Sequence, residues 1–383
     1  MNDTFILAAK RTPIGSFQGM FSKLTATSLG AHAIKSVTLD LAIDPGRIDE
    51  VYMGNVVSAG LRQAPARQAM REAGLVDTTP ATTVNKVCGS GMKATMIGQD
   101  SIKLGNASCI VVGGMESMTN MPHLLPRVRR GYRLGHREVL DSMFTDGLED
   151  ADTNKTMGDY AQITADEYQV TRESMDEFAI GSLTKARKAM DSEDLKHEIA
   201  PINDLNEDEQ PRKSDVEAIS RLRPVFRKDG TITAASTSSI SDGASALLLA
   251  NESLVEAENH EPLCRIVAHA SIALAPQKFV LAPIYAIQTL LKQTEWDIDS
   301  VDLFEINEAF AVVTMLAVDH LKLDPSKVNI FGGSCAQGHP LGSTGSRLIV
   351  TLAHALRVKN LRRGIAALCI GGGEGTAIAL ERD

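Results

Sequence analysis

The sequence predicts an α/β fold built from two similar halves. Short apolar runs alternate with amphipathic stretches along the 383 residues, which favours strands alternating with helices. Two segments, 48–58 and 301–311, share a polar start, an apolar run and an asparagine, which indicates an internal duplication. The chain is 43% hydrophobic and long enough for two or more cores, because single cores stop growing beyond roughly 250–300 residues.

Individual elements can be placed from the same patterns. The runs 110–113 and 364–370 are apolar and lead into glycine, so we predict buried strands there. The stretches 26–41 and 347–356 have apolar residues at helical spacing and predict helices.

The order of the motifs supports the duplication. Cys88 lies 33 residues after Asn55, and His339 lies 32 residues after Asn307. Each half then reaches a glycine-rich strand end, VVGGMES in the first and CIGGGEG in the second. A duplicated α/β unit explains this order, and chance similarity among glycine-rich segments is the alternative.

A more charged and less regular region, 118–239, separates the two halves and carries five arginines within 127–137. Long insertions in compact folds often carry binding or assembly, whereas a solvated loop is the alternative. We therefore divide the chain into three parts. The N-terminal half comprises residues 1–117 and 240–262, the inserted loop domain comprises residues 118–239, and the C-terminal half comprises residues 263–383.

Composition excludes several classes of function. The net charge is −9 and no long basic stretch is present, so we expect no nucleic-acid partner. The apolar run 5–9 is too short for a signal peptide, and no apolar stretch approaches the roughly 20 residues that span a bilayer. We expect a soluble, cytoplasmic protein with no membrane partner, and leave open whether a targeting leader was removed. The five cysteines are scattered without a CxxC pair, so we expect thiols rather than disulfides or a metal site.

Two glycine-bearing turns offer a nucleophile and a base. In NKVCGSGMKA, Cys88 precedes a helix-like run, where the N-terminal end of a helix lowers a thiol pKa. In GHPLG, His339 lies between glycine and proline, in a rigid and open position from which it could deprotonate a thiol. A buried cysteine and a structural histidine are the alternatives.

Two further motifs end strand-like runs. Cys369 is followed, after one residue, by three glycines whose amides can converge on an oxyanion, and its thiol could act as a base. Asn307 begins NEAFA, and its amide could hold a water or orient an imidazole. A plain glycine turn and an ordinary strand end are the alternatives.

These four motifs together resemble the thiolase family, which comprises acetyl-CoA acetyltransferases and 3-ketoacyl-CoA thiolases. The resemblance runs from ILAAKRTPIGSFQG to GGGEGTAIALER. It implies a five-layer αβαβα thiolase fold and a CoA-dependent acyltransferase with CoA as substrate and no other cofactor. By the resemblance, Cys88 is the acylated nucleophile, His339 activates it, and Cys369 moves the α-proton. Asn307 fixes a catalytic water, and Gly371 is an oxyanion donor together with the amide of Cys88.

The resemblance also implies a set of CoA and substrate contacts. The segment 233–244 resembles the family's pantetheine-binding stretch but departs from its common TAGNAS form. Thr156 stands where many members have a histidine. The alignment near Arg212 is loose, and Arg221 competes with it. The implied contacts are Leu148, Met157, Arg212, Ala234, Ser238, Phe279, Ala309 and Phe310.

The expected activity is reversible condensation of two acetyl-CoA to acetoacetyl-CoA and CoA. The segment KFVLAP, which contains Phe279, resembles thiolases that act on short acyl chains, so we expect Phe279 to line the acyl pocket. A phenylalanine of the hydrophobic core is the alternative. A degradative 3-ketoacyl-CoA thiolase of fatty acid β-oxidation, with longer-chain specificity, is the alternative within the family. A condensing enzyme that uses an acyl carrier protein is a second alternative, but such enzymes typically have histidine in place of the second cysteine, so Cys369 argues against it. A lipid-binding or scaffolding relative is a third, but it would not need both cysteines together with His339.

Several properties are left open by the sequence. The physiological direction and the acyl chain length are undetermined. The arginine-rich stretch resembles the family's tetramerisation loop, so we expect a homo-oligomer, either a dimer or a homotetramer.

Overall fold

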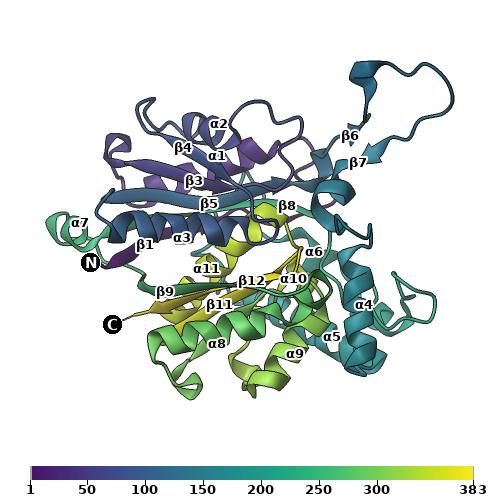
Figure 1. The fold of residues 1–383 in the computed structure, drawn as a ribbon. Coiled ribbons are helices and arrows are strands. Elements are labelled where there is room, and N and C mark those ends of the chain that lie inside the picture. Colours follow the sequence, from purple (N-terminus) through teal and green to yellow (C-terminus); the bar gives the residue numbers. More distant parts are fainter. Residues whose placement is uncertain (1, 383) are drawn as a thin grey trace.

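The computed structural model describes residues 2–382 and contains one central sheet with helices packed on it (Figure 1). Its strands run in the spatial order β4-β3-β5-β8-β1-β9-β12-β11-β10, and the short strand β2 pairs with β8. The strands of this sheet are β1 (Thr4–Arg11), β2 (Gly15–Ser16), β3 (Glu50–Gly54), β4 (Ala81–Val84), β5 (Cys109–Ser117), β8 (Ser241–Asn251), β9 (Cys264–Ala273), β10 (Leu303–Ile306), β11 (Arg363–Ile370) and β12 (Glu374–Glu381).

The helices confirm both stretches predicted as helical. Helix α11 begins at Leu341, before the predicted 347–356. Residues 342–346 are glycine, serine and threonine and show no apolar period, so the sequence pattern did not reveal this first part. The helices are α1 (Ala26–Asp40), α2 (Pro65–Glu72), α3 (Ser90–Lys103), α4 (Met157–Glu167), α5 (Arg172–Asp191), α6 (Glu209–Lys213), α7 (Glu252–Ala257), α8 (Ala282–Thr294), α9 (Ala311–Leu321), α10 (Ser334–Gln337) and α11 (Leu341–Val358).

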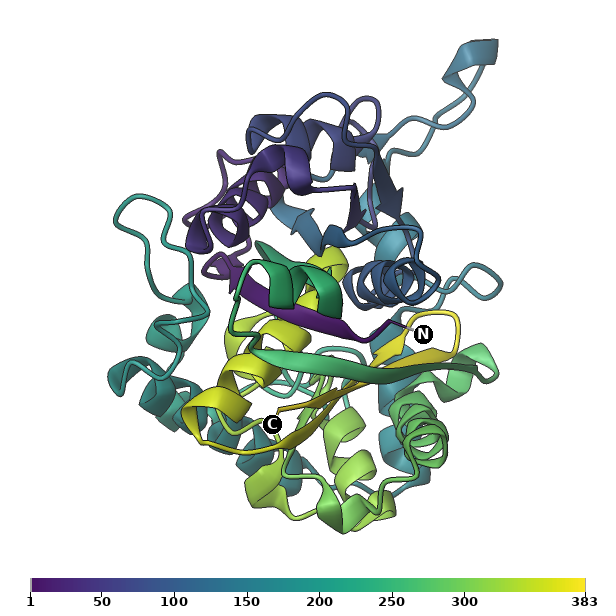
Figure 2. The same cartoon turned by 90° about the vertical axis from the view of Figure 1, so that its left-hand side faces the viewer.

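The duplication predicted from the sequence is confirmed. In the first half β3 pairs in parallel with β5, which pairs antiparallel with β8. In the second half β10 pairs in parallel with β11, which pairs antiparallel with β12. Both β3 and β10 run into a fully buried asparagine, Asn55 or Asn307. The halves join where β1 lies antiparallel to β9, with Thr4 opposite Ile266 (Figure 2).

The helices and the two parts of the sheet form the expected αβαβα layers (Figure 1). Helix α1 covers the outer face of the first part, with α2 beside it, and α8 covers the outer face of the second. Helices α3 and α11 pack against each other between the two parts. Helix α11 is buried on every side from Leu341 to Leu356, as a helix enclosed between two sheets must be.

Glycines let the two central helices approach closely at their N-terminal ends. A Cβ at Gly91 of α3 would lie 2.5 Å from Ser346 Oγ, and one at Gly345 of α11 would lie 2.4 Å from Met92 N. A side chain at either position would push the helices apart. This contact brings the turns that precede α3 and α11 together, and those turns carry Cys88 and His339.

The region between β5 and β8 contains α4, α5, α6 and a small two-stranded ribbon. The ribbon strands are β6 (His123–Leu124) and β7 (Leu140–Asp141), and the chain between them projects from the body of the molecule (Figure 1). This projection carries the arginine-rich stretch 127–137, which is mostly exposed. Within residues 2–382, no helix is both long and apolar enough to cross a membrane.

Candidate active site

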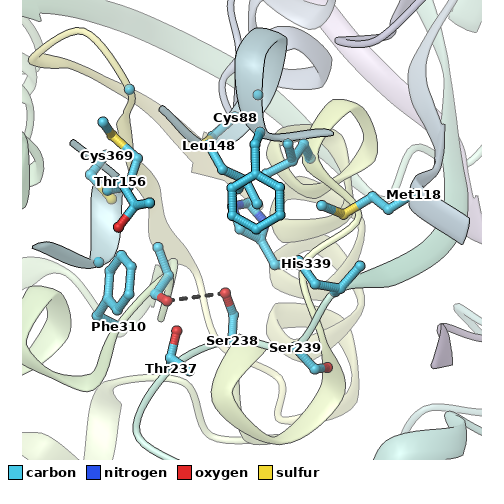
Figure 3. Close-up of a pocket in the computed structure, with 18 of the residues that line it drawn as sticks. Cys88, Met118, Leu148, Thr156, Thr237, Ser238, Ser239, Phe310, His339 and Cys369 are labelled. Carbon is cyan, nitrogen blue, oxygen red and sulfur yellow. Dashed lines mark hydrogen bonds between the residues drawn. The ribbon is translucent and has the colours of Figure 1, made fainter. Parts of the chain in front are cut away.

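One cavity of about 250 Å³ collects most of the predicted site residues (Figure 3). Its walls are largely apolar, which favours binding of an acyl or alkyl chain. The predicted residues that line it are Cys88, Leu148, Met157, Ser238, Phe279, Ala309, Phe310, His339, Cys369 and Gly371.

Cys88 lies in a tight turn directly before α3. The turn contains Val87 in the left-handed region, at φ +47°, which is strained for a β-branched residue. Side chains hold it in place: Asn85 Oδ1 accepts from Val87 N at 3.0 Å, and the Ser90 hydroxyl donates to the carbonyl of Val87 at 2.6 Å. Lys86 in the same turn forms an ion pair with Glu374. The turn that contains Cys88 is thereby tied to the glycine turn of the other half.

Burial raises the pKa of the Cys88 thiol to about 11, and the backbone N–H of Gly371, directed at the thiol, opposes this shift. The sequence-based expectation that the helix N-terminus lowers this pKa is therefore wrong for the free protein. Desolvation of the thiolate outweighs the helix end, because Cys88 is only 9% exposed. At neutral pH the thiol keeps its proton, and it could act as a nucleophile only if a base removed that proton.

His339 lines the same cavity as Cys88 and has the protonation state of such a base. Burial, together with the nearby Arg347 cation, lowers the pKa of His339 to about 3, so the imidazole is neutral at physiological pH. Its backbone N–H donates to Ser239 O at 3.2 Å, and Gly338 before it has φ +108°, a conformation that favours glycine. Its Nδ1 lies 2.6 Å from Thr344 Oγ1, and its Nε2 lies 3.5 Å from Asn307 Nδ2.

Cys369 is the penultimate residue of β11 and is 1% exposed. Burial raises its pKa well above the ordinary value, and the neighbouring Cys88 adds to the shift. The glycine turn follows, with Gly372 at φ +86° and Gly373 at φ +91°. A Cβ on Gly373 would also lie 2.4 Å from Leu274 O, so both conformation and space require glycine there.

Another part of the cavity wall is formed by two segments that are distant in the sequence, one containing Ser238 and the other Ala309 and Phe310. The Ser238 hydroxyl and backbone N–H both donate to the carbonyl of Ala309 at 3.0 Å, and the hydroxyl bond is the dashed line in Figure 3. The Phe310 ring meets the Phe279 ring edge to face, with centroids 6.2 Å apart. The Phe226 ring meets Phe310 in the same manner at 5.9 Å. These aromatic rings give the apolar wall a fixed shape.

Three predicted residues lie outside the cavity lining. Asn307 lies behind His339, which it contacts as described above. Ala234 lines a neighbouring cavity of about 230 Å³, which shares Ser239 with the first. Arg212 lines neither cavity and forms ion pairs with Glu207 and Asp191. Its predicted contact with CoA stays a prediction.

Sequence reasoning missed two buried groups at the site. Thr344 holds the imidazole, and its place five residues after His339 was the available signal. Glu116 accepts from Val56 N and Gly342 N at 2.9 Å each, and burial raises its pKa to about 7. It joins the loop after β3 to the start of α11, although nothing in VVGGMES marked that long-range partner.

No set of three or more His, Cys, Asp or Glu side chains among residues 2–382 is arranged to hold a metal ion.

The two α/β halves each contribute a buried thiol, Cys88 or Cys369, to one cavity, and comparison with known proteins defines the family. The family model described as "Thiolase, N-terminal domain" matches residues 4–253, and "Thiolase, C-terminal domain" matches residues 260–382. The chain belongs to the thiolase family.

Similar proteins cover the whole chain. An acetyl-CoA acetyltransferase of Schizosaccharomyces pombe is 44% identical over 99% of both chains, and one of Pseudomonas aeruginosa is 42% identical over 100% of both. The crystal structure of the Acat5 thiolase from Ascaris suum in complex with coenzyme A has a TM-score of 0.95 at 38% identity, covering 100% of both chains. That of the Bacillus anthracis acetyl-CoA acetyltransferase has a TM-score of 0.97 at 36% identity, covering 100% of this chain and 99% of the other.

Proposed function

We propose that this protein is a CoA-dependent thiolase that joins two acetyl-CoA molecules into acetoacetyl-CoA and CoA, and catalyses the reverse thiolysis. The observation that carries the proposal is the convergence of Cys88, His339, Cys369 and the Gly371 amide on one apolar cavity. The relatives described above are named thiolase or acetyl-CoA acetyltransferase, which supports the same activity.

The first half-reaction transfers an acetyl group to Cys88. Neutral His339 takes the thiol proton as the sulfur attacks the thioester carbonyl, and the protonated imidazole then returns that proton to the departing CoA thiolate. The N–H groups of Gly371 and Cys88 stabilise the oxyanion of the tetrahedral intermediate. The apolar cavity excludes water that would otherwise hydrolyse the acyl-cysteine.

The second half-reaction forms the carbon–carbon bond. Burial keeps the Cys369 thiol protonated, so neutral His339 first takes its proton. The resulting thiolate removes a proton from the methyl carbon of a second acetyl-CoA, and the enolate attacks the acyl carbon on Cys88. Cys88 leaves as a thiolate and takes the proton held by the His339 imidazolium, and acetoacetyl-CoA is formed. The enolate needs hydrogen-bond donors at its oxygen, and we assign a water held by Asn307, together with His339, to that role. Thiolysis follows the same steps in reverse.

We propose the domain division stated above, with the insertion 118–239 supplying CoA contacts. Leu148, Met157 and Ser238 from this region contribute to the cavity wall, which supports a role in binding pantetheine. The remaining proposed CoA contacts are Ala234, Ala309 and Phe310, which line the two cavities, and Arg212, which forms ion pairs with Glu207 and Asp191. CoA enters as substrate, and the proposal includes no other cofactor.

We propose that the volume of the cavity limits the length of the acyl chain that the protein accepts. Phe279 is 2% exposed and its ring lies in the wall, where it occupies volume that a longer acyl chain would need. The names of the relatives favour the short-chain activity over the degradative alternative. We place the protein in acetyl-CoA and fatty acid metabolism and propose a cytoplasmic location, although a Xenopus laevis relative of 42% identity is named mitochondrial.

We expect acetoacetyl-CoA to be the best substrate in a thiolysis assay across 3-ketoacyl-CoA esters of increasing length, with 2-methylacetoacetyl-CoA included. Activity should fall in steps as the chain grows, because one methylene is worth only about 1–3 kcal/mol. Phe279→Ala should flatten the profile through higher kcat/KM for longer chains.

The matched control is Phe21→Ala, which removes an equally buried ring outside the cavity lining. It should lower stability and leave the profile unchanged. A wild-type profile that rises with chain length would reject the short-chain activity in favour of the degradative one, and a wild type inactive on every ester would reject the thiolase proposal.

We propose that the protein is a homo-oligomer whose projecting loop makes the contacts between copies. The loop exposes Leu125, Val128 and Leu134 beside its arginines, and such side chains gain from burial against another copy. Replacing residues 127–137 by a short glycine-serine linker should give a smaller species in sedimentation, with an unchanged circular dichroism spectrum. A monomeric wild type, or a variant of unchanged size, would contradict this assignment.

A further inference from the structure

A chain of buried hydrogen bonds runs behind the imidazole of His339 and includes Arg347 and Ser334, which have no role in the proposed reaction. Arg347 Nη2 donates to Ser334 Oγ at 3.2 Å, and the Ser334 hydroxyl donates to Asn307 Oδ1 at 2.6 Å. Asn307 Nδ2 then faces His339 Nε2 at 3.5 Å. Apart from His339, which is 5% exposed, all these side chains are 1% exposed or less, so bulk water does not compete for their bonds.

The cation at one end sets the direction of every bond in this chain. A guanidinium can only donate, so the Ser334 oxygen must accept from Arg347. The single Ser334 hydrogen is then free for Asn307, and it can only be received by the amide oxygen. The NH₂ end of Asn307 is therefore turned toward His339. A Glu305 carboxyl oxygen lies 3.5 Å from Arg347 Nη1, and burial raises the pKa of this carboxyl to about 8.

The hydrogen bond on the other side of the imidazole shows which ring nitrogen of His339 carries the proton. The Thr344 hydroxyl donates to the carbonyl of Pro340 at 3.0 Å, so its oxygen accepts from His339 Nδ1 at 2.6 Å. Nδ1 thus carries the proton, and Nε2 presents its lone pair. The amide donor facing Nε2 disfavours the other tautomer, because two N–H groups would then point at each other. At 3.5 Å this contact is weak enough to leave the lone pair available to a thiol.

We propose that Ser334 is a positioning residue that orients the Asn307 amide and, through it, keeps His339 in the tautomer that accepts a proton at Nε2. This inference rests on the proposed thiolase function and adds a residue to it. Without the Ser334 hydroxyl, the Asn307 amide loses the partner that distinguishes its two ends, and the opposite orientation would place an acceptor against the lone pair of Nε2.

The test compares wild type, Ser334→Ala, Asn307→Ala and the double variant. Two rates are measured: thiolysis of acetoacetyl-CoA, and alkylation of Cys88 by iodoacetamide, followed by peptide mass spectrometry. Ser334→Ala should lower kcat about three- to tenfold, the value of one hydrogen bond, and leave KM within about twofold. In the Asn307→Ala background the same change should cause no further loss in either rate, because Ser334 acts through that amide.

Ser346→Ala is the matched control. Its hydroxyl is equally buried and, among residues 2–382, bonds only to Ser245 and the carbonyl of Ser343. It should leave both rates unchanged, and thermal unfolding of all variants shows which ones remain folded. Additive losses in the double variant, a change in KM alone, or an equal loss in Ser346→Ala would overturn the inference. A wild type without thiolysis activity would reject the proposed function, while the alkylation rates would still decide the role of Ser334.

Discussion

Replacing Cys88 by serine should abolish the acetyl adduct that forms when the protein is incubated with acetyl-CoA. A serine hydroxyl is a far weaker acid than a thiol, and His339 with its lowered pKa cannot deprotonate it appreciably. Loss of a nucleophile of this kind costs on the order of 10⁴-fold or more in turnover. Intact-protein mass spectrometry measures the adduct directly, and the thiolysis assay measures the turnover.

Cys264→Ser provides the control for this experiment. Cys264 is also buried, and burial raises the pKa of its thiol to about 12, but it lines no part of the cavity. The adduct should form normally on this variant. An undiminished adduct on Cys88→Ser would assign the nucleophile to another residue.

Replacing Cys369 by alanine should separate the two half-reactions. The variant should still gain an acetyl group from acetyl-CoA, because Cys88, His339 and the Gly371 amide are unchanged. It should fail to exchange the methyl protons of acetyl-CoA with deuterium, because the base that removes them is gone. A positioned base contributes about 10²- to 10⁴-fold, so exchange followed by NMR should fall by at least about a hundredfold.

Cys335→Ala is the matched control for Cys369. Its thiol is also buried and lies against the carbonyl of Glu308 at 3.6 Å, outside the cavity of about 250 Å³. Exchange should continue at the wild-type rate in this variant. Normal exchange in Cys369→Ala would move the role of base to another group, and loss of acetylation in that variant would mean that Cys369 also supports the first step.

Local sequence was sufficient to predict the elements that carry the site. The turns around Cys88 and His339 depend on neighbouring glycines and on the helix that follows each of them, and such information is contained within a few residues. The duplicated strands β3 and β10 were likewise visible, because each half repeats its own pattern of apolar run and asparagine. The αβαβα layers followed from that repeat together with the resemblance to a known family.

Long-range contacts were not accessible in the same way. The salt-bridged position of Arg212 depends on Asp191 of α5 and on Glu207, and no local pattern shows which carboxylates will meet a given arginine. The bond from Ser334 to Asn307 joins residues 27 positions apart, from the short helix α10 and the end of β10. Such pairs form only when the packed elements bring them together.

The sequence alone determined which chemical groups the protein offers: two thiols, an imidazole and an amide, each in a glycine-bearing turn or at the end of a strand-like run. The tertiary structure alone decided their state. Cys88 was expected to have a lowered pKa, yet burial raises it, and the same burial lowers the pKa of His339. The free energy of removing a charged group from water depends on all the atoms packed around that group. The pKa values of Cys88 and His339 are therefore determined by the packing of the two halves around the cavity, which no local sequence pattern shows.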